Sequence, residues 1–141
     1  MKSLFLTLSL LAPMLAHAET PTEQVQKIEA LRKTCLDNAQ SNMDMKMCEF
    51  TAYQDSDKIL NAQYKEVVDT LSKASDADSK ETLRRLVVSE RAWIAYRDAD
   101  CDFNGVEMLG GSGESLVIAG CLADAEAARV LELDQVLNPG N

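Results

Sequence analysis

The sequence is poor in histidine, aromatic residues and basic residues. It has 1 histidine among 141 residues, and aromatic side chains make up only 5%. The 14 Lys and Arg residues are outnumbered by 23 Asp and Glu residues, so the net charge is −9 at pH 7. Nucleic-acid phosphates and anionic lipids repel such a chain. The composition therefore argues against nucleic acid and membrane surfaces as partners and favours a basic protein.

The first 18 residues have the pattern of a secretory signal peptide. A positively charged start precedes an apolar stretch over residues 4–15, and residues 16–18 match an A-x-A cleavage site. The apolar stretch is too short to span a bilayer. We expect a single domain over residues 19–141, located in the periplasm or outside the cell and carrying no membrane anchor.

Cleavage at this site would remove His17, the single histidine of the chain. Without imidazole there is no Ser-His or Cys-His nucleophile pair and no histidine-ligated zinc site. The commonest general base near neutral pH is also lost. Catalysis would have to depend on paired carboxylates, Lys or Tyr, and we predict a protein that is not an enzyme and uses neither metal nor cofactor.

Four cysteines occur in the chain, at Cys35, Cys48, Cys101 and Cys121. An even number of cysteines in an exported protein predicts two disulfides. Of the three possible connectivities, the pairs Cys35–Cys48 and Cys101–Cys121 close the shortest loops at the least entropic cost. A zinc site is disfavoured because the sequence contains no C-x-x-C motif.

Helical periodicity accounts for the rest of the chain, and no run has the period-two alternation of a strand. Capping residues at Thr20, Ser41 and Asp78 mark three helix starts, and glycine-rich turns separate the last two helices. The expected helices cover residues 20–37, 43–73, 78–104 and 115–137. The predicted fold is all-α, a four-helix bundle made of two disulfide-stapled helical hairpins.

Charged residues interrupt the apolar stripes of the second and third predicted helices. Asp57, Glu90 and Arg97 fall at positions where their neighbours predict burial. Because an unpaired buried charge is costly, we expect Arg97 to contact Asp57, Glu90 or both, with Asn61 and Tyr64 as further partners. This set could be a structural polar cluster or the carboxylate pair of a glycosidase. An arginine between two acids keeps both ionised, which favours the structural interpretation.

Two further patterns favour packing or solvent over ligand binding. Residues 100–105 copy the first half of a calcium-binding loop, but its twelfth position is Gly111, where a bidentate Glu is required. Met43 and Met47 share the apolar face of a predicted helix, so we expect them to pack rather than bind a soft metal. We expect Trp93 to belong to the core.

Three short runs occur in a distinctive order along the chain. They are Asp57-x-x-Leu60-Asn61-x-x-Tyr64, then Trp93-x-x-x-Arg97-Asp98-x-x-Cys101, then Gly110-Gly111-Ser112 followed by Cys121 and Arg129-x-x-x-Leu133. With Cys35 and Cys48, the chain resembles the LprI-like lysozyme-inhibitor domain over nearly all of its mature length. It departs from such domains at Glu90, where they often carry Gln, and at Glu126, where Thr is common. The resemblance implies a small secreted or periplasmic helical domain, some relatives of which inhibit lysozyme.

The leading functional hypothesis is therefore a lysozyme inhibitor that blocks the active-site cleft of a basic lysozyme. The run Gly110-Gly111-Ser112-Gly113 is the candidate contact, because it offers backbone N–H groups and a hydroxyl to a cleft that holds two carboxylates. Glu107 and Glu114 flank this run and oppose deep insertion. The run could instead be a plain connection that lets the second disulfide close. Alternative functions are an interaction or adaptor module for another envelope protein and, less favoured, a carboxylate-based hydrolase of cell-wall glycan.

Overall fold

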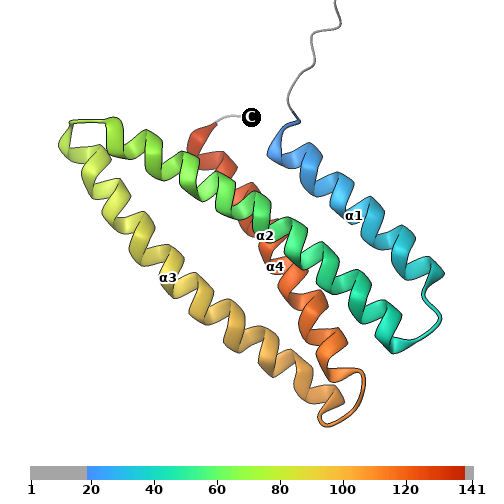
Figure 1. The fold of residues 1–141 in the computed structure, drawn as a ribbon. Coiled ribbons are helices and arrows are strands. Elements are labelled where there is room, and N and C mark those ends of the chain that lie inside the picture. The colour runs from blue at the N-terminus through green and yellow to red at the C-terminus, as the bar shows by residue number, and fades with distance from the viewer. Residues whose placement is uncertain (1–18, 139–141) are drawn as a thin grey trace, which may run out of the picture.

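The computed structural model describes residues 19–138 and confirms the all-α prediction. Four α-helices pack together, and one short 3-10 helix precedes the last of them (Figure 1). The elements are α1 (Pro21–Asn38), α2 (Asn42–Lys73), α3 (Ala77–Gly105), η1 (Val106–Met108) and α4 (Glu114–Leu137). The expected signal peptide, with His17, and the last three residues lie outside the described part of the chain.

Side-chain caps determine where the first three helices begin. The hydroxyls of Thr20 and Ser41 each accept a hydrogen bond from the backbone N–H three residues later, at 3.2 and 3.1 Å. Glu23 completes a capping box by accepting from the N–H of Thr20 at 2.8 Å. For α3 the expected cap is wrong, because Asp76 rather than Asp78 fills this role and accepts from an N–H at 2.8 Å. Asp78 lies within the first turn, where its charge favours the positive end of the helix dipole.

The packing of α4 against α2 forms the centre of the fold, and these two helices share the largest interface. In Figure 1, α1 and α3 lie on opposite sides of α2. The buried face of α4 consists mainly of small residues, with larger ones toward its end: Ala119, Ala123, Glu126, Ala127, Val130 and Leu133. Alanines at one-turn spacing leave room for the backbone of the neighbouring helix to approach closely.

The hydrophobic core lies where α1, α2 and α4 meet. Its buried members are Val25, Leu60, Ala127, Val130 and Leu133. Trp93 and Leu86 of α3 pack against this cluster but stay partly exposed, so Trp93 lies at the edge of the core in which we expected it. Each large apolar side chain buried here stabilises the fold by about 2 kcal/mol.

Both disulfides lie at the same end of the bundle, and they join the expected pairs. Cys35–Cys48 closes the turn between α1 and α2, and Cys101–Cys121 closes the segment between α3 and α4. We call this end the braced end. The opposite end, which includes the connection between α2 and α3, carries no disulfide among the described residues.

The two methionines expected to pack are exposed instead, so that prediction is wrong. Met43 and Met47 are 63% and 52% exposed. The buried face of this part of α2 is formed by Cys48, Ala52 and Ser56, one helical turn apart. Small side chains form the close contact between the helices, and the larger methionines point away from it.

The Cys101–Cys121 disulfide should contribute substantially to stability. It encloses a segment with a sequence separation of 20, for which restriction of the unfolded chain is worth about 3 kcal/mol. Replacing both Cys101 and Cys121 by Ala should lower the free energy of unfolding in urea by about this amount. An unchanged urea midpoint in the double variant would contradict the prediction.

Candidate functional site

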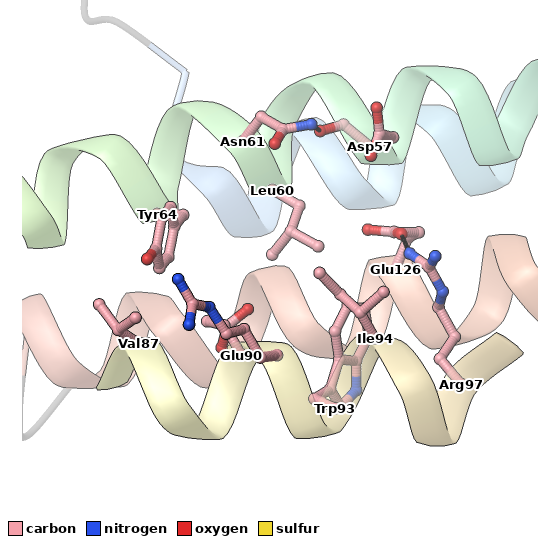
Figure 2. Close-up of a pocket in the computed structure, with 11 residues that line it drawn as sticks. Asp57, Leu60, Asn61, Tyr64, Val87, Glu90, Trp93, Ile94, Arg97 and Glu126 are labelled. Atoms are coloured by element: carbon pink, nitrogen blue, oxygen red, sulfur yellow. Dashed lines mark hydrogen bonds and ion pairs between the residues drawn. The ribbon is translucent and has the colours of Figure 1, made fainter. Parts of the chain in front are cut away.

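A polar groove of about 230 Å³ lies between α2 and α3, with α4 behind it (Figure 2). All five residues that we expected to cluster line this groove: Asp57, Asn61, Tyr64, Glu90 and Arg97. Its remaining lining is Leu60, Val87, Arg91, Trp93, Ile94 and Glu126. The groove therefore combines an apolar wall with several charged groups.

Arg97 forms ion pairs with Glu126 of α4 and with Asp98, its neighbour on α3. The expected pairing with Asp57 or Glu90 is wrong. The side chain of Glu126 is 0% exposed and needs a counter-charge more than the partly exposed Asp57 does. Glu90 has a different partner.

Glu90 is paired with Arg129 of α4, whose Nε donates to the carboxylate at 2.8 Å. Arg129 also contacts Glu132, one turn further along α4, at 2.5 Å. The guanidinium carbons of Arg97 and Arg129 lie 5.2 and 5.6 Å from the centroid of the Trp93 ring. These are cation–π distances, so both arginines are held by an acid and by the same aromatic ring.

The sequence reasoning did not identify Glu126 and Arg129 as members of this cluster. The sequence does contain a pattern that predicts the burial of Glu126. This residue has helical spacing with Ala119, Ala123 and Val130, which together form one buried face of the helix. A fully buried acid in that register requires a basic partner.

Glu126 is the most unusual group of the groove. One carboxylate oxygen accepts from Arg97, while Oε2 is buried and has no hydrogen-bond partner among the described residues. Burial raises the pKa of Glu126 to about 7; Arg97 opposes the rise, and the negative charges of Asp57 and Asp98 add to it. Burial raises the pKa of Tyr53 of α2, and the negative charges of Asp57 and Glu126 add to the rise.

The glycine-rich run forms an ordered turn at the braced end. Gly110 has a φ of +72°, which glycine adopts without steric cost. Its N–H donates to Glu114 at 2.8 Å, and the N–H of Gly111 donates to a carbonyl oxygen of η1 at 2.8 Å. Asn42 at the start of α2 donates to the hydroxyl of Ser112 at 3.0 Å, which joins the two turns of this end.

Apolar side chains surround this turn and face solvent. Four of them, all between 50% and 72% exposed, define what we call the apolar patch: Phe103, Val106, Met108 and Leu109. They belong to the end of α3, to η1 and to the residue after it. An exposed apolar cluster of this kind is typical of a protein-binding surface.

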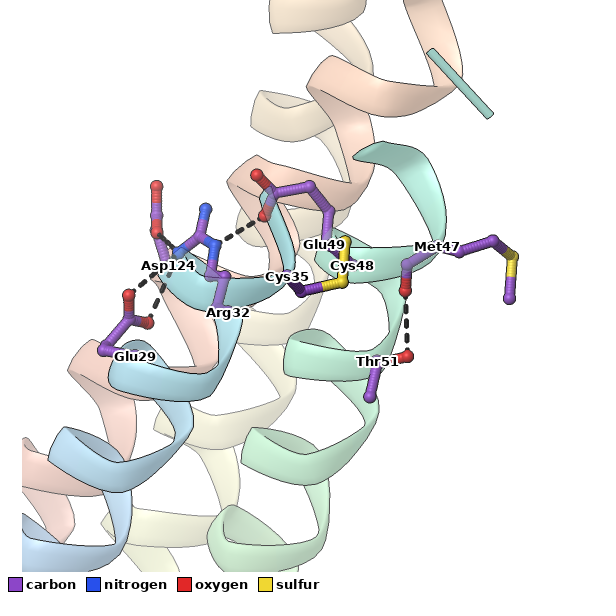
Figure 3. Close-up of polar contacts among 8 residues, drawn as sticks. All are labelled: Glu29, Arg32, Cys35, Met47, Cys48, Glu49, Thr51 and Asp124. Atoms are coloured by element: carbon purple, nitrogen blue, oxygen red, sulfur yellow. Dashed lines mark hydrogen bonds and ion pairs between the residues drawn. A yellow bond between two sulfur atoms is a disulfide. The ribbon is translucent and has the colours of Figure 1, made fainter. Parts of the chain in front are cut away.

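A second charge cluster, in which Arg32 and Glu49 are largely buried, joins α1, α2 and α4 beside the Cys35–Cys48 disulfide (Figure 3). Arg32 contacts Glu49 at 2.6 Å and also pairs with Glu29 and Asp124. Three acids surround one arginine, and this arrangement ties three helices together. The cluster is suited to a structural role.

The segment that resembled a calcium loop is helical. Residues 100–105 belong to α3, so their side chains point in different directions and cannot enclose an ion as a loop does. Across residues 19–138, no group of three or more His, Cys, Asp and Glu side chains is placed to hold a metal ion. None of the described helices is long and apolar enough to cross a membrane.

The raised pKa of Glu126 makes stability depend on pH. The folded-state pKa of about 7 exceeds the ordinary value of 4.5, so folding favours the protonated form. The stability that this preference contributes is full below pH 4.5 and is lost as the pH rises through about 7. Relative to the wild type, Glu126→Gln should therefore become more stable as the pH rises.

Urea denaturation of both proteins at about pH 5 and about pH 8 measures this difference. Glu66→Gln, which removes an exposed acid from α2, is the matched control and should follow the wild type. Parallel pH profiles for Glu126→Gln and the wild type would contradict the prediction.

Comparisons with known proteins assign most of the chain to one family. Residues 35–133, which include both disulfides and the whole groove, match the model of the family described as lysozyme inhibitor LprI. An uncharacterized protein of Rhizobium meliloti (strain 1021) is 35% identical over 105 residues, covering 70% of this chain and 76% of that protein. No solved structure gives a significant match. On the extent of these matches, the chain belongs to the LprI family.

Proposed function

We propose that the protein is an exported, non-enzymatic binding protein that inhibits a lysozyme by covering the rim of its active-site cleft. The observation that carries the proposal is the apolar patch beside the glycine turn, at the end of the bundle that both disulfides stabilise. A rigid surface loses little conformational freedom on binding, and this favours affinity. The name of the family gives the class of target.

The charge distribution supports a basic partner. Asp100, Asp102 and Glu107 lie close to the apolar patch in sequence, and the whole chain carries −9. A negative field around an apolar contact would speed association with a strongly basic lysozyme, and salt would weaken this effect. The apolar patch itself would supply most of the binding energy.

The hydrogen bonds of the turn favour contact at the rim over deep insertion. The N–H groups of Gly110 and Gly111 are used within the turn and its flanking residues, so they are not offered to a partner. Ser112 already accepts a hydrogen bond from Asn42. In this proposal Leu109 and its apolar neighbours make the contact, and the glycines allow the chain to turn closely behind them.

The groove is poorly suited to hydrolysis of glycan. Glycosidases need two carboxyl groups that reach the substrate. Glu90 is buried against Arg129, and Glu126 is fully buried against Arg97. Asp57 is then the one carboxylate of the groove lining that is left to face a substrate, which supports a binding protein over an enzyme.

Two features support a location in the periplasm or outside the cell. The first 18 residues have a signal-peptide pattern, and all four cysteines are paired in disulfides. Disulfides persist in oxidising compartments and are rare in the cytosol.

Inhibition assays with the purified chain of residues 19–141 against several lysozyme types test the proposal. Leu109→Asp should reduce inhibition at least about 10-fold, because it places a charge in the centre of an apolar contact. Val88→Asp is the matched control, since Val88 is an exposed apolar residue of α3 outside the patch. It should inhibit as well as the wild type.

Absence of inhibition at a large molar excess, across all lysozyme types, would overturn the proposed target. Equal loss in Leu109→Asp and Val88→Asp would instead overturn the assignment of the contact to the braced end. Circular dichroism of both variants shows whether the helices are intact.

A further inference from the structure

We infer that the groove between α2 and α3 is a binding site for a primary ammonium group carried on an alkyl chain, seated against Asp57 and above Glu126. This inference does not depend on lysozyme inhibition, because the groove lies on other residues than the apolar patch. The chemical class covers the side chain of lysine and small ω-amino acids.

At the end of the groove formed by Asp57, Glu126 and Arg97, acidic groups outnumber basic ones. The carboxylate of Asp57 has no hydrogen-bond or ion-pair partner among residues 19–138; only its backbone carbonyl is used, accepting from Asn61 at 2.8 Å. Beneath it, Oε2 of the fully buried Glu126 is also unpartnered. Figure 2 shows Asp57 on α2 and Glu126 beneath it, at the end of the groove where Arg97 lies. Asp98 already shares the charge of Arg97, so one arginine serves two acids before Asp57 is counted.

The remaining residues that line the groove fit the rest of such a ligand. Leu60, Val87 and Ile94 line its length and provide an apolar wall for methylene groups. Arg91 also lines the groove, has no ion-pair partner in the described part of the chain, and precedes Arg97 by six residues. Six residues span about 9 Å of helix, comparable with an extended chain of five or six carbons. In a ligand with an ammonium group at one end and a carboxylate at the other, the ammonium would bind Asp57 and the carboxylate would bind Arg91.

An ammonium group suits this position better than a metal ion or a sugar. It has three N–H donors, which fit the oxygens of Asp57, Glu126 and Asn61. A positive charge would also compensate the burial that raises the pKa of Glu126 and would favour its ionised form. No group of three or more His, Cys, Asp or Glu side chains among the described residues is placed to hold a metal ion.

Titration of the 15N-labelled chain with 6-aminohexanoate tests the site. Trp93 is the single tryptophan and lines the groove, so its indole N–H resonance is an unambiguous reporter. We expect a saturable shift of this resonance with 6-aminohexanoate and with hexylamine, and none with hexanoate, which lacks the ammonium group. Asp57→Asn should weaken binding of both amines at least about 10-fold, while Glu66→Gln, an exposed acid of the same helix, should leave it unchanged.

The variant Arg91→Gln tests the contact with the ligand's carboxylate separately from the contact with its ammonium group. It should weaken 6-aminohexanoate, which carries a carboxylate, but not hexylamine. Nα-acetyl-lysine methylamide then distinguishes the sources of the ammonium group: saturable binding indicates a lysine side chain, and binding of 6-aminohexanoate alone indicates a free ω-amino acid. Equal shifts with hexanoate and 6-aminohexanoate, or wild-type affinity in Asp57→Asn, would overturn the inference.

Discussion

Close packing of α4 against α2 is the constraint on which the rest of the structure depends. The alanines of α4 and the small residues of α2 let the two backbones approach, and α1 and α3 are then added on either side of α2 (Figure 1). α3 contacts α4 more extensively than it contacts α2. The groove lies between α2 and α3. It forms because α3 packs mainly on α4 and contacts α2 less extensively.

The buried charges follow from the same packing. Glu126 lies on the face of α4 that the neighbouring helices cover, and removing a carboxylate from water costs several kcal/mol unless a cation compensates it. Arg97 and Arg129 reach from the surface of the helices to Glu126 and Glu90, and Trp93 lies beneath both guanidinium groups. The pairs link α3 to α4, where apolar burial is sparse: in α3 the buried residues are Glu90, Cys101 and Gly105. Ion pairs and one disulfide thus hold α3 where a larger apolar face is missing.

Much of the fold could be predicted from local chemistry, because helix periodicity, caps and short disulfide loops are properties of neighbouring residues. The identity of charge partners could not, since it depends on which helices pack together. The sequence places Arg97 on the same face of α3 as Ile94, one turn away. Its pairing with Glu126 could not be predicted, because it requires α4 to lie behind the groove.

The exposure of Met43 also depends on how the helices pack. Hydrophobicity alone favours burial of this side chain, whereas the contact between the helices is formed by small residues such as Ala52. The glycine turn was found from composition, but its ordering by Asn42 was not, because the hydrogen bond joins residues 70 positions apart.

The braced end and the groove differ in how completely their polar groups are paired. Binding a large partner through the apolar patch requires a surface that does not rearrange, and both disulfides and the Asn42–Ser112 hydrogen bond lie where they restrict it. The groove instead keeps the unpaired carboxylate of Asp57 and a buried oxygen of Glu126 that has no donor among the described residues, and the unsatisfied buried oxygen lowers stability. The ion pair with Arg97 uses one oxygen of Glu126 to link α3 to α4, so it does not account for the second oxygen or for Asp57. A bound cation of the kind that we infer would satisfy both groups.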